Sequence, residues 1–77
     1  MKEFEIRLTS VQDIQKFVAL ATAQLFPVSV RDLHTQVNGK SFMEMFCLNF
    51  TDPLFAMVEC GEEQLLQLLS ELQCFLA

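Results

Sequence analysis

The sequence predicts an α+β domain in which helices cover one face of an antiparallel four-stranded sheet. The N-terminal segment alternates apolar and polar residues as a half-buried strand does, and two later segments repeat apolar residues at helical spacing. Between them, β-prone residues flank an Asn-Gly pair, a strong hairpin signal. The predicted order is strand, helix, strand, strand, short helix, strand, helix, an open-faced sandwich with two main helices and, where one segment is helical, a short third. At 77 residues the chain (1–77) has room for one domain and one core.

The first strand is predicted from Phe4, Ile6 and Leu8, which alternate with Glu5 and Arg7. Period-2 alternation of this kind is typical of a strand with one face in the core.

A helix is predicted from about Ser10 to Gln24, and the proline that follows stops it. Thr9 with Gln12, or Ser10 with Asp13, would form a capping box at its start. Its apolar face is expected to consist of Val11, Ile14, Phe17, Val18, Ala21 and Leu25.

A hairpin is predicted at Asn38-Gly39, the preferred pair for a two-residue turn in which both positions need φ > 0. Val28 to Val37 is the incoming strand and Lys40 to Met45 the returning strand. The apolar phase shifts between Val30 and Leu33. A bulge, or a strand that begins only near Asp32, would explain that shift.

The second half of the chain ends with a strand and a helix. Glu44 to Asp52 fits either a short helix or a continued strand, because its length alone does not decide. Leu54 to Cys60 is a largely apolar strand, expected inside the sheet. Glu62 and Glu63 then open a helix, where its dipole favours acids. The apolar stripe of that helix is Leu65, Leu68, Leu69, Leu72 and Leu76.

The charge balance argues against nucleic acid and anionic membranes as targets. The net charge is −5, and the five basic residues are scattered along the chain: Lys2, Arg7, Lys16, Arg31 and Lys40. No apolar run reaches the ~20 residues of a membrane span, and the N-terminus does not resemble a signal peptide. We therefore expect a cytoplasmic protein.

The three cysteines, Cys47, Cys60 and Cys74, are widely spaced and form no CxxC pair. Zinc binding and thioredoxin-like chemistry therefore have little support, and we predict no metal and no cofactor. The three residues are expected to be free thiols packed in or near the core.

With this order in hand, the chain resembles HPr, the small phosphocarrier of the sugar phosphotransferase system. The resemblance rests on the first strand running into a helix that holds Ile14 and Ala19, on Val37-Asn38-Gly39-Lys40, and on the closing segment from Leu54 to Leu76. It implies an HPr-like open-faced β-sandwich. It also implies phosphotransferase-system or regulatory proteins as partners.

The active-site segment departs from the family. HPr proteins carry a Gly-Ile-His-Ala-Arg-Pro-Ala type motif at the mouth of the first helix, where the histidine accepts phosphate. The matching run here is Asp13 to Ala19, with Gln15 in place of the histidine, Phe17 in place of the arginine and Val18 in place of the proline. An amide nitrogen is not nucleophilic, so the resemblance implies a domain without catalytic residues. The regulatory serine of the family has no clear counterpart either, because Ser41 falls inside the predicted strand.

Two polar candidates remain. Thr9, Ser10 and Lys16 surround the start of the first helix, so backbone amides there could bind an anion. Asp13 opposes this by its negative charge, and plain capping is the alternative interpretation. His34, the only histidine, lies on the predicted second strand without a base or anion site near it, so we expect a structural or surface role.

Apolar residues gather in one part of the sequence: Phe42, Met43, Met45, Phe46, Phe50 and Phe55. They are either core or an exposed interaction surface, and the second alternative predicts a homodimer or an obligate partner. The leading hypothesis is a non-catalytic HPr-like binding or regulatory module. The alternatives are a phosphotransfer component that uses Ser10 or His34 as acceptor, and a generic α+β dimerisation or ligand-binding module.

Overall fold

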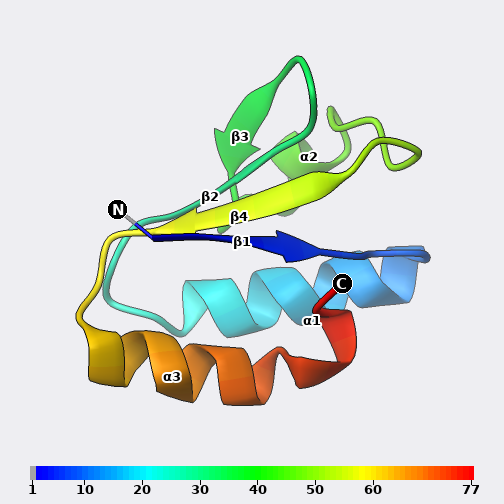
Figure 1. Ribbon diagram of the computed structural model, residues 1–77. Helices are drawn as coiled ribbons and strands as arrows, with labels where there is room; N and C mark the ends of the chain where they lie inside the picture. The colour runs from blue at the N-terminus through cyan, green and yellow to red at the C-terminus, as the bar shows by residue number, and fades with distance from the viewer. Residues whose placement is uncertain (1) are drawn as a thin grey trace.

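Seven helices and strands and one 3₁₀ turn follow one another in the predicted order (Figure 1). The computed structural model describes residues 2–77. The elements are β1 (Lys2–Ile6), α1 (Val11–Thr22), β2 (Val28–Arg31), β3 (Gln36–Asn38), α2 (Phe42–Met45), β4 (Leu54–Val58), α3 (Glu62–Glu71) and η1 (Gln73–Phe75).

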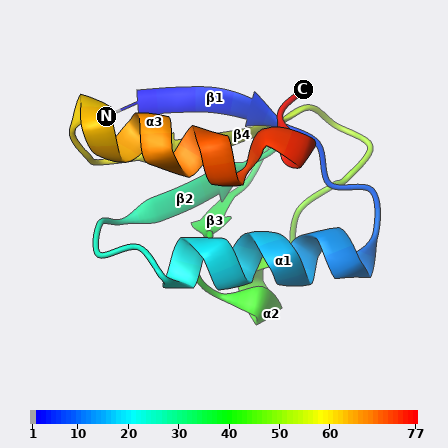
Figure 2. The same cartoon turned by 90° about the horizontal axis from the view of Figure 1, so that it is seen from below.

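The four strands form one antiparallel sheet in the order β1-β4-β2-β3. β4 lies between β1 and β2, which confirms the prediction that the last apolar strand is internal. Both long helices, α1 and α3, cover the same face of this sheet, as predicted (Figures 1 and 2). The short α2 lies against α1 and β3. Within residues 2–77, no helix has both the length and the apolar character needed to cross a membrane.

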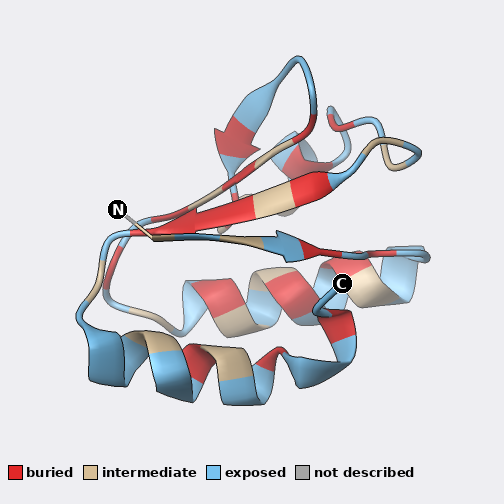
Figure 3. Ribbon diagram, viewed as in Figure 1, coloured by how far each residue is buried: buried red, intermediate tan, exposed pale blue. Residues whose placement is uncertain are grey.

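The core fills the space between the sheet and the two long helices (Figure 3). Strand register places alternate residues on this side, so that Ile6, Val30, Leu54, Ala56 and Val58 are all buried. The largest side chains that the helices and loops add to them are Phe17, Met45, Leu68 and Leu72. This division between inward and outward residues confirms the predicted α+β sandwich.

The open face of the sheet is polar rather than apolar. Glu3 on β1 and Arg31 on β2 form an ion pair across β4, with 3.1 Å between Arg31 Nε and Glu3 Oε2. The Arg31 guanidinium also lies 4.6 Å from the centre of the Phe55 ring. Met57, which is opposite Glu3 in the register, is buried. The uncovered sheet face is therefore mostly polar, and its apolar residues Phe55 and Met57 are half-buried and buried, respectively.

Helix α1 begins at the cap that Ser10 and Asp13 were predicted to form. The Ser10 hydroxyl accepts a hydrogen bond from the Asp13 N–H at 3.1 Å, and the Asp13 carboxylate accepts from the N–H and hydroxyl of Thr9, each at 3.0 Å. The prediction that Val11 and Leu25 belong to the apolar face is wrong, because Val11 is 53% exposed and Leu25 is 100% exposed. Val11 lies in the first turn of α1, outside the core, and Leu25 lies beyond Thr22, the last residue of the helix.

The predicted hairpin turn at Asn38-Gly39 is wrong. The chain reverses five residues earlier, where the Asp32 N–H donates to the Thr35 carbonyl at 2.9 Å and Arg31 pairs with Gln36. Gly39 has no positive φ, so no type I′ turn forms there. The phase shift between Val30 and Leu33 marked the true turn, and His34 lies in that turn rather than in a strand.

Lys40 to Met45 is not a returning strand. Phe42 to Met45 forms α2, and the hydroxyl of its N-cap residue Ser41 accepts from the Glu44 N–H at 3.3 Å. Of the two alternatives for Glu44 to Asp52, the continued strand is wrong and the short helix holds only for Glu44 and Met45, because turns follow from Phe46 onward. Ser41 thus caps a helix, whereas the prediction placed it inside a strand.

The C-terminal helix α3 follows the prediction at its centre and departs from it at its end. Leu68 and Leu72 are buried, and Leu65 and Leu69 are half-buried. Beyond the helix, η1 turns the chain so that Phe75 enters the core while Leu76 is 37% exposed and bridges to Ile6. The Arg7 N–H donates to the Phe75 carbonyl at 2.7 Å, which holds the chain end against the edge of β1.

Candidate functional site

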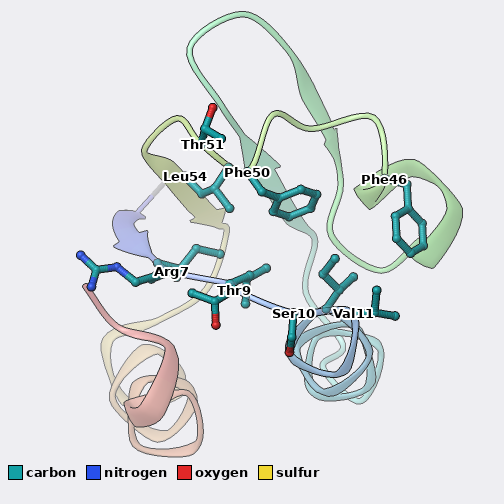
Figure 4. A pocket seen from close by; sticks show the side chains of 11 residues that line it. Arg7, Thr9, Ser10, Val11, Phe46, Phe50, Thr51 and Leu54 are labelled. Carbon is teal, nitrogen blue, oxygen red and sulfur yellow. The ribbon is translucent and has the colours of Figure 1, made fainter.

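A hollow in the described chain lies beside the start of α1 (Figure 4). It has a volume of about 600 Å³. It lies between two parts of the chain, the segment that runs from β1 into α1 and the segment between α2 and β4. Its floor is made of buried core side chains, namely Ile6, Leu8, Ile14 and Leu54. We call this hollow the α1 groove.

The walls of the α1 groove are apolar and partly aromatic. Phe46 and Phe50 lie on the α2–β4 side, and Val11 lies opposite on α1 (Figure 4). Phe46 is 48% exposed, and its ring contacts that of Phe42 edge to face with 4.8 Å between centroids. That contact holds an exposed aromatic ring in one orientation at the edge of the groove.

The polar residues around the α1 groove do not converge on it. In Figure 4 the guanidinium of Arg7 points away from the hollow, and Thr9 and Ser10 turn their hydroxyl oxygens away from the two phenylalanines. The Ser10 hydroxyl already accepts the Asp13 N–H, and the Thr9 hydroxyl donates to the Asp13 carboxylate. The groove is therefore suited to apolar groups.

The predicted anion site contains a carboxylate of its own. The backbone N–H of Thr9, and after it the Thr9 hydroxyl, lower the pKa of Asp13 from its usual value of 3.8, against a smaller opposing effect of burial. Asp13 is thus ionised at neutral pH, at the turn where an anion would bind. Lys16 does not line the groove with Thr9 and Ser10. It borders a second, shallower hollow between α1 and η1, together with Glu71 and Phe75.

The position matched to the family acceptor is not at the helix mouth. Gln15 is exposed in the second turn of α1, whereas the residue at the mouth is Ser10. Phe17 is only 1% exposed, so its position cannot hold an arginine that contacts phosphate, and Val18 is half-buried. Gln15 therefore does not lie at the mouth of α1, where the resemblance would place the acceptor.

The predicted interaction surface divides into core and exposed residues. Met45 is fully buried and belongs to the core, and Phe42 and Phe50 are half-buried against it. Met43, 79% exposed, and Phe46 remain available to a partner. Phe55 is half-buried on the open face of the sheet, below Arg31.

The cysteines and the histidine form no cluster. Cys60 is half-buried and packs against the core, but Cys47 and Cys74 are exposed, so the prediction of core thiols is wrong for these two. His34 is exposed, and its backbone N–H donates to Asp32. Residues 2–77 contain no group of three or more His, Cys, Asp or Glu side chains arranged to hold a metal ion.

Sequence reasoning missed two features of this region. Asp32, 4% exposed, joins the β2–β3 turn to Asn49, and the sequence Asp-Leu-His-Thr is a signal for the Asx turn that it forms. Val11 was assigned to the core because it fits the helical period, yet it forms a wall of the α1 groove.

Two comparisons with known proteins leave the chain without an assigned family. No protein-family model matches the sequence, and no curated protein matches it.

Proposed function

We propose that this chain is a non-catalytic HPr-like domain that binds a partner protein through the α1 groove. The observation that carries the proposal is the groove itself, an apolar hollow at the mouth of the first helix, walled by Val11, Phe46 and Phe50. The resemblance to HPr places the phosphoryl acceptor at this mouth. The α+β sandwich with both long helices on one face is the fold that the resemblance implies.

The shape and lining of the groove favour a protein over a small molecule. Small-molecule sites enclose most of their ligand and aim a few polar groups at it. The α1 groove is open, and the polar groups at its edge are bonded to one another or point away. An exposed aromatic side chain beside a hollow, here Phe46, is typical of the anchors in protein–protein interfaces.

The groups at the helix mouth support a binding role rather than phosphotransfer. Ser10 uses its hydroxyl as an N-cap, and the Asp13 carboxylate adds negative charge where a phosphoryl group would have to sit. The proposed partners are phosphotransferase-system or regulatory proteins in the cytoplasm. Because the chain carries a net charge of −5, we expect basic residues around the apolar anchors of the partner.

A binding titration tests this proposal. Isotope-labelled chain is titrated with the unphosphorylated phosphoenolpyruvate-dependent kinase of the phosphotransferase system, and amide shifts are followed by NMR. We expect changes at Val11, Phe46 and Phe50, and a loss of affinity of about tenfold or more in Phe46→Asp. Leu66→Asp, at an exposed apolar residue of α3 that does not line the groove, is the matched control and should bind normally. Shifts confined to other surfaces would contradict the proposal.

One observation favours a second candidate function. Ser10, rather than Gln15, stands at the helix mouth, where the family has its acceptor. A phosphocarrier that uses Ser10 would transfer label from phosphoenolpyruvate through the kinase, and Ser10→Ala would abolish that transfer while His34→Ala would not.

A further inference from the structure

The Asn38-Gly39 pair joins β3 to α2 instead of forming a hairpin turn. In this dipeptide the Asn side chain is chemically labile, because glycine has no side chain to hinder attack by its backbone nitrogen on the preceding side-chain carbonyl. The same pair is therefore a site of spontaneous deamidation wherever the chain is flexible. Whether it reacts depends on how the fold holds the two reacting groups.

The structure holds both groups away from reaction. The Gly39 N–H donates to the Val28 carbonyl at 2.8 Å, so the attacking nitrogen is engaged at the end of the sheet. The Asn38 side-chain oxygen accepts from the Lys40 N–H at 2.9 Å, which orients the side chain along the following residues. Asn38 is also a strand residue, paired with Ser29 of β2 in the sheet.

Residues of α2 and its N-cap hold the segment that joins β3 to α2, which we call the β3–α2 junction. The Glu44 carboxylate accepts from the Asn38 N–H at 3.2 Å, and the Ser41 N–H donates to the Asn38 carbonyl at 3.1 Å. Ser41 is at the same time the N-cap of α2. Asn38 can therefore reach a reactive conformation only when the first turn of this four-residue helix opens.

We infer that Asn38 is a latent deamidation site, which the β3–α2 junction protects and which local opening of α2 exposes. The backbone nitrogen of Gly39 loses its proton and bonds to Cγ of Asn38, while the bond from Cγ to the side-chain nitrogen breaks and ammonia leaves. Water then adds to either carbonyl of the five-membered succinimide, which yields aspartate or isoaspartate. Water is the only co-reactant, and nothing is oxidised or reduced.

The product would not fit the junction. It places a new carboxylate beside Glu44, whose own carboxylate now accepts the Asn38 N–H. Isoaspartate also adds a methylene to the main chain and shifts Gly39 from its bond to Val28. Because α2 leads directly into Phe46, deamidation would displace one wall of the α1 groove irreversibly.

Peptide mapping by mass spectrometry tests the inference on the full chain at mildly alkaline pH, with and without urea. In urea, Asn38 should deamidate much faster than Asn49, whose bulky neighbour Phe50 makes it the internal reference. In buffer, deamidation of Asn38 should be at least tenfold slower than in urea, which corresponds to an opening free energy of about 1.4 kcal/mol or more. Equal rates in the two conditions would overturn the inference.

Two matched N-cap variants separate local from global opening. Ser41→Ala removes the cap of α2 and should speed deamidation of Asn38 in buffer about fivefold, whereas Ser10→Ala removes the cap of α1 and should change it little. Glu44→Ala, which removes the acceptor of the Asn38 N–H, should act like Ser41→Ala. Equal acceleration by variants of α1 and α2 at equal loss of stability would show that only global unfolding exposes the site.

Discussion

The Asp32 side chain holds the β2–β3 turn and connects it to the segment before β4. Its carboxylate accepts backbone hydrogen bonds from His34 at 2.7 Å, Thr35 at 2.6 Å and Asn49 at 2.8 Å. The first two bonds form the β2–β3 turn, and the third ties that turn to the segment before β4. The N–H of Asn49, followed by that of His34, lowers the pKa of Asp32 from its usual 3.8, although burial opposes the shift.

Asp32→Asn is expected to destabilise the fold at neutral pH, because an amide nitrogen cannot accept the hydrogen bonds that a carboxylate oxygen accepts. The folded pKa of Asp32 lies below the unfolded one, so its contribution is present above the unfolded pKa and is lost as the pH falls through the folded pKa. The difference between wild type and variant in urea midpoint should therefore shrink below about pH 4. Glu63→Gln, on the exposed side of α3, is the control, and a constant difference down to low pH would contradict this account.

Gly39 is required for a close approach rather than for a special φ. A Cβ at this position would lie 2.9 Å from Cγ1 of Val28 and 3.2 Å from its carbonyl oxygen, and Val28 is held in the core. Gly39→Ala should cost roughly 1–3 kcal/mol of unfolding free energy. At Gly61 a Cβ would meet only the Gln64 side chain, at 3.8 Å, so Gly61→Ala should be neutral or slightly stabilising. Equal effects in thermal unfolding would refute the distinction.

At the scale of elements, periodicity was enough for β1, α1, β4 and α3. β1, α1 and α3 each bury one regular face, and β4 is apolar throughout and lies inside the sheet. The order of the elements along the chain, and the position of both long helices on one face of the sheet, followed from these patterns. The middle of the chain could not be predicted in this way. Asn38-Gly39 is the strongest local hairpin signal, but the buried Asp32 carboxylate accepts the hydrogen bonds of a turn that forms five residues earlier. Such a network depends on Asn49, which is distant in sequence and invisible to a local pattern.

The orientation of α2 leads to a prediction about its two methionines. Met43 is 79% exposed and Met45 is fully buried, although both lie in the same turn of helix. Met43→Glu should change the unfolding free energy by no more than about 0.5 kcal/mol. Met45→Glu should unfold the domain or cost several kcal/mol, because it buries a carboxylate without a partner. Chemical denaturation measures both, and similar effects would mean that α2 faces the core differently.

At the scale of the whole molecule, large apolar side chains are exposed on several segments, for example Leu25 and Leu66. Among the exposed ones, Val11 and Phe46 line the α1 groove, and Met43 lies on α2 three residues before Phe46. Composition predicted that some apolar side chains would be exposed, but not which ones. Choosing them required the positions at which α1 and α2 begin, which the caps at Ser10 and Ser41 determine.

If a second copy of the chain is the partner, we expect the two copies to associate through α2 and the α1 groove. Wild-type chain should then sediment as a dimer at high concentration, and Met43→Glu should shift it to a monomer without unfolding it. Leu66→Glu on α3 is the matched control and should leave the dimer intact. A monomer at all concentrations would rule out a second copy and leave a different protein as the occupant of the α1 groove.

The most direct test of a binding domain without a phosphoryl acceptor is the intact mass of the chain after incubation with phosphoenolpyruvate and the kinase of the phosphotransferase system. We predict an unchanged mass for the wild type. Gln15→His should be unchanged too, because a histidine there stands in the second turn of α1 and not at its mouth. A gain of one phosphoryl group by the wild type, on Ser10, His34 or any other residue, would contradict the account.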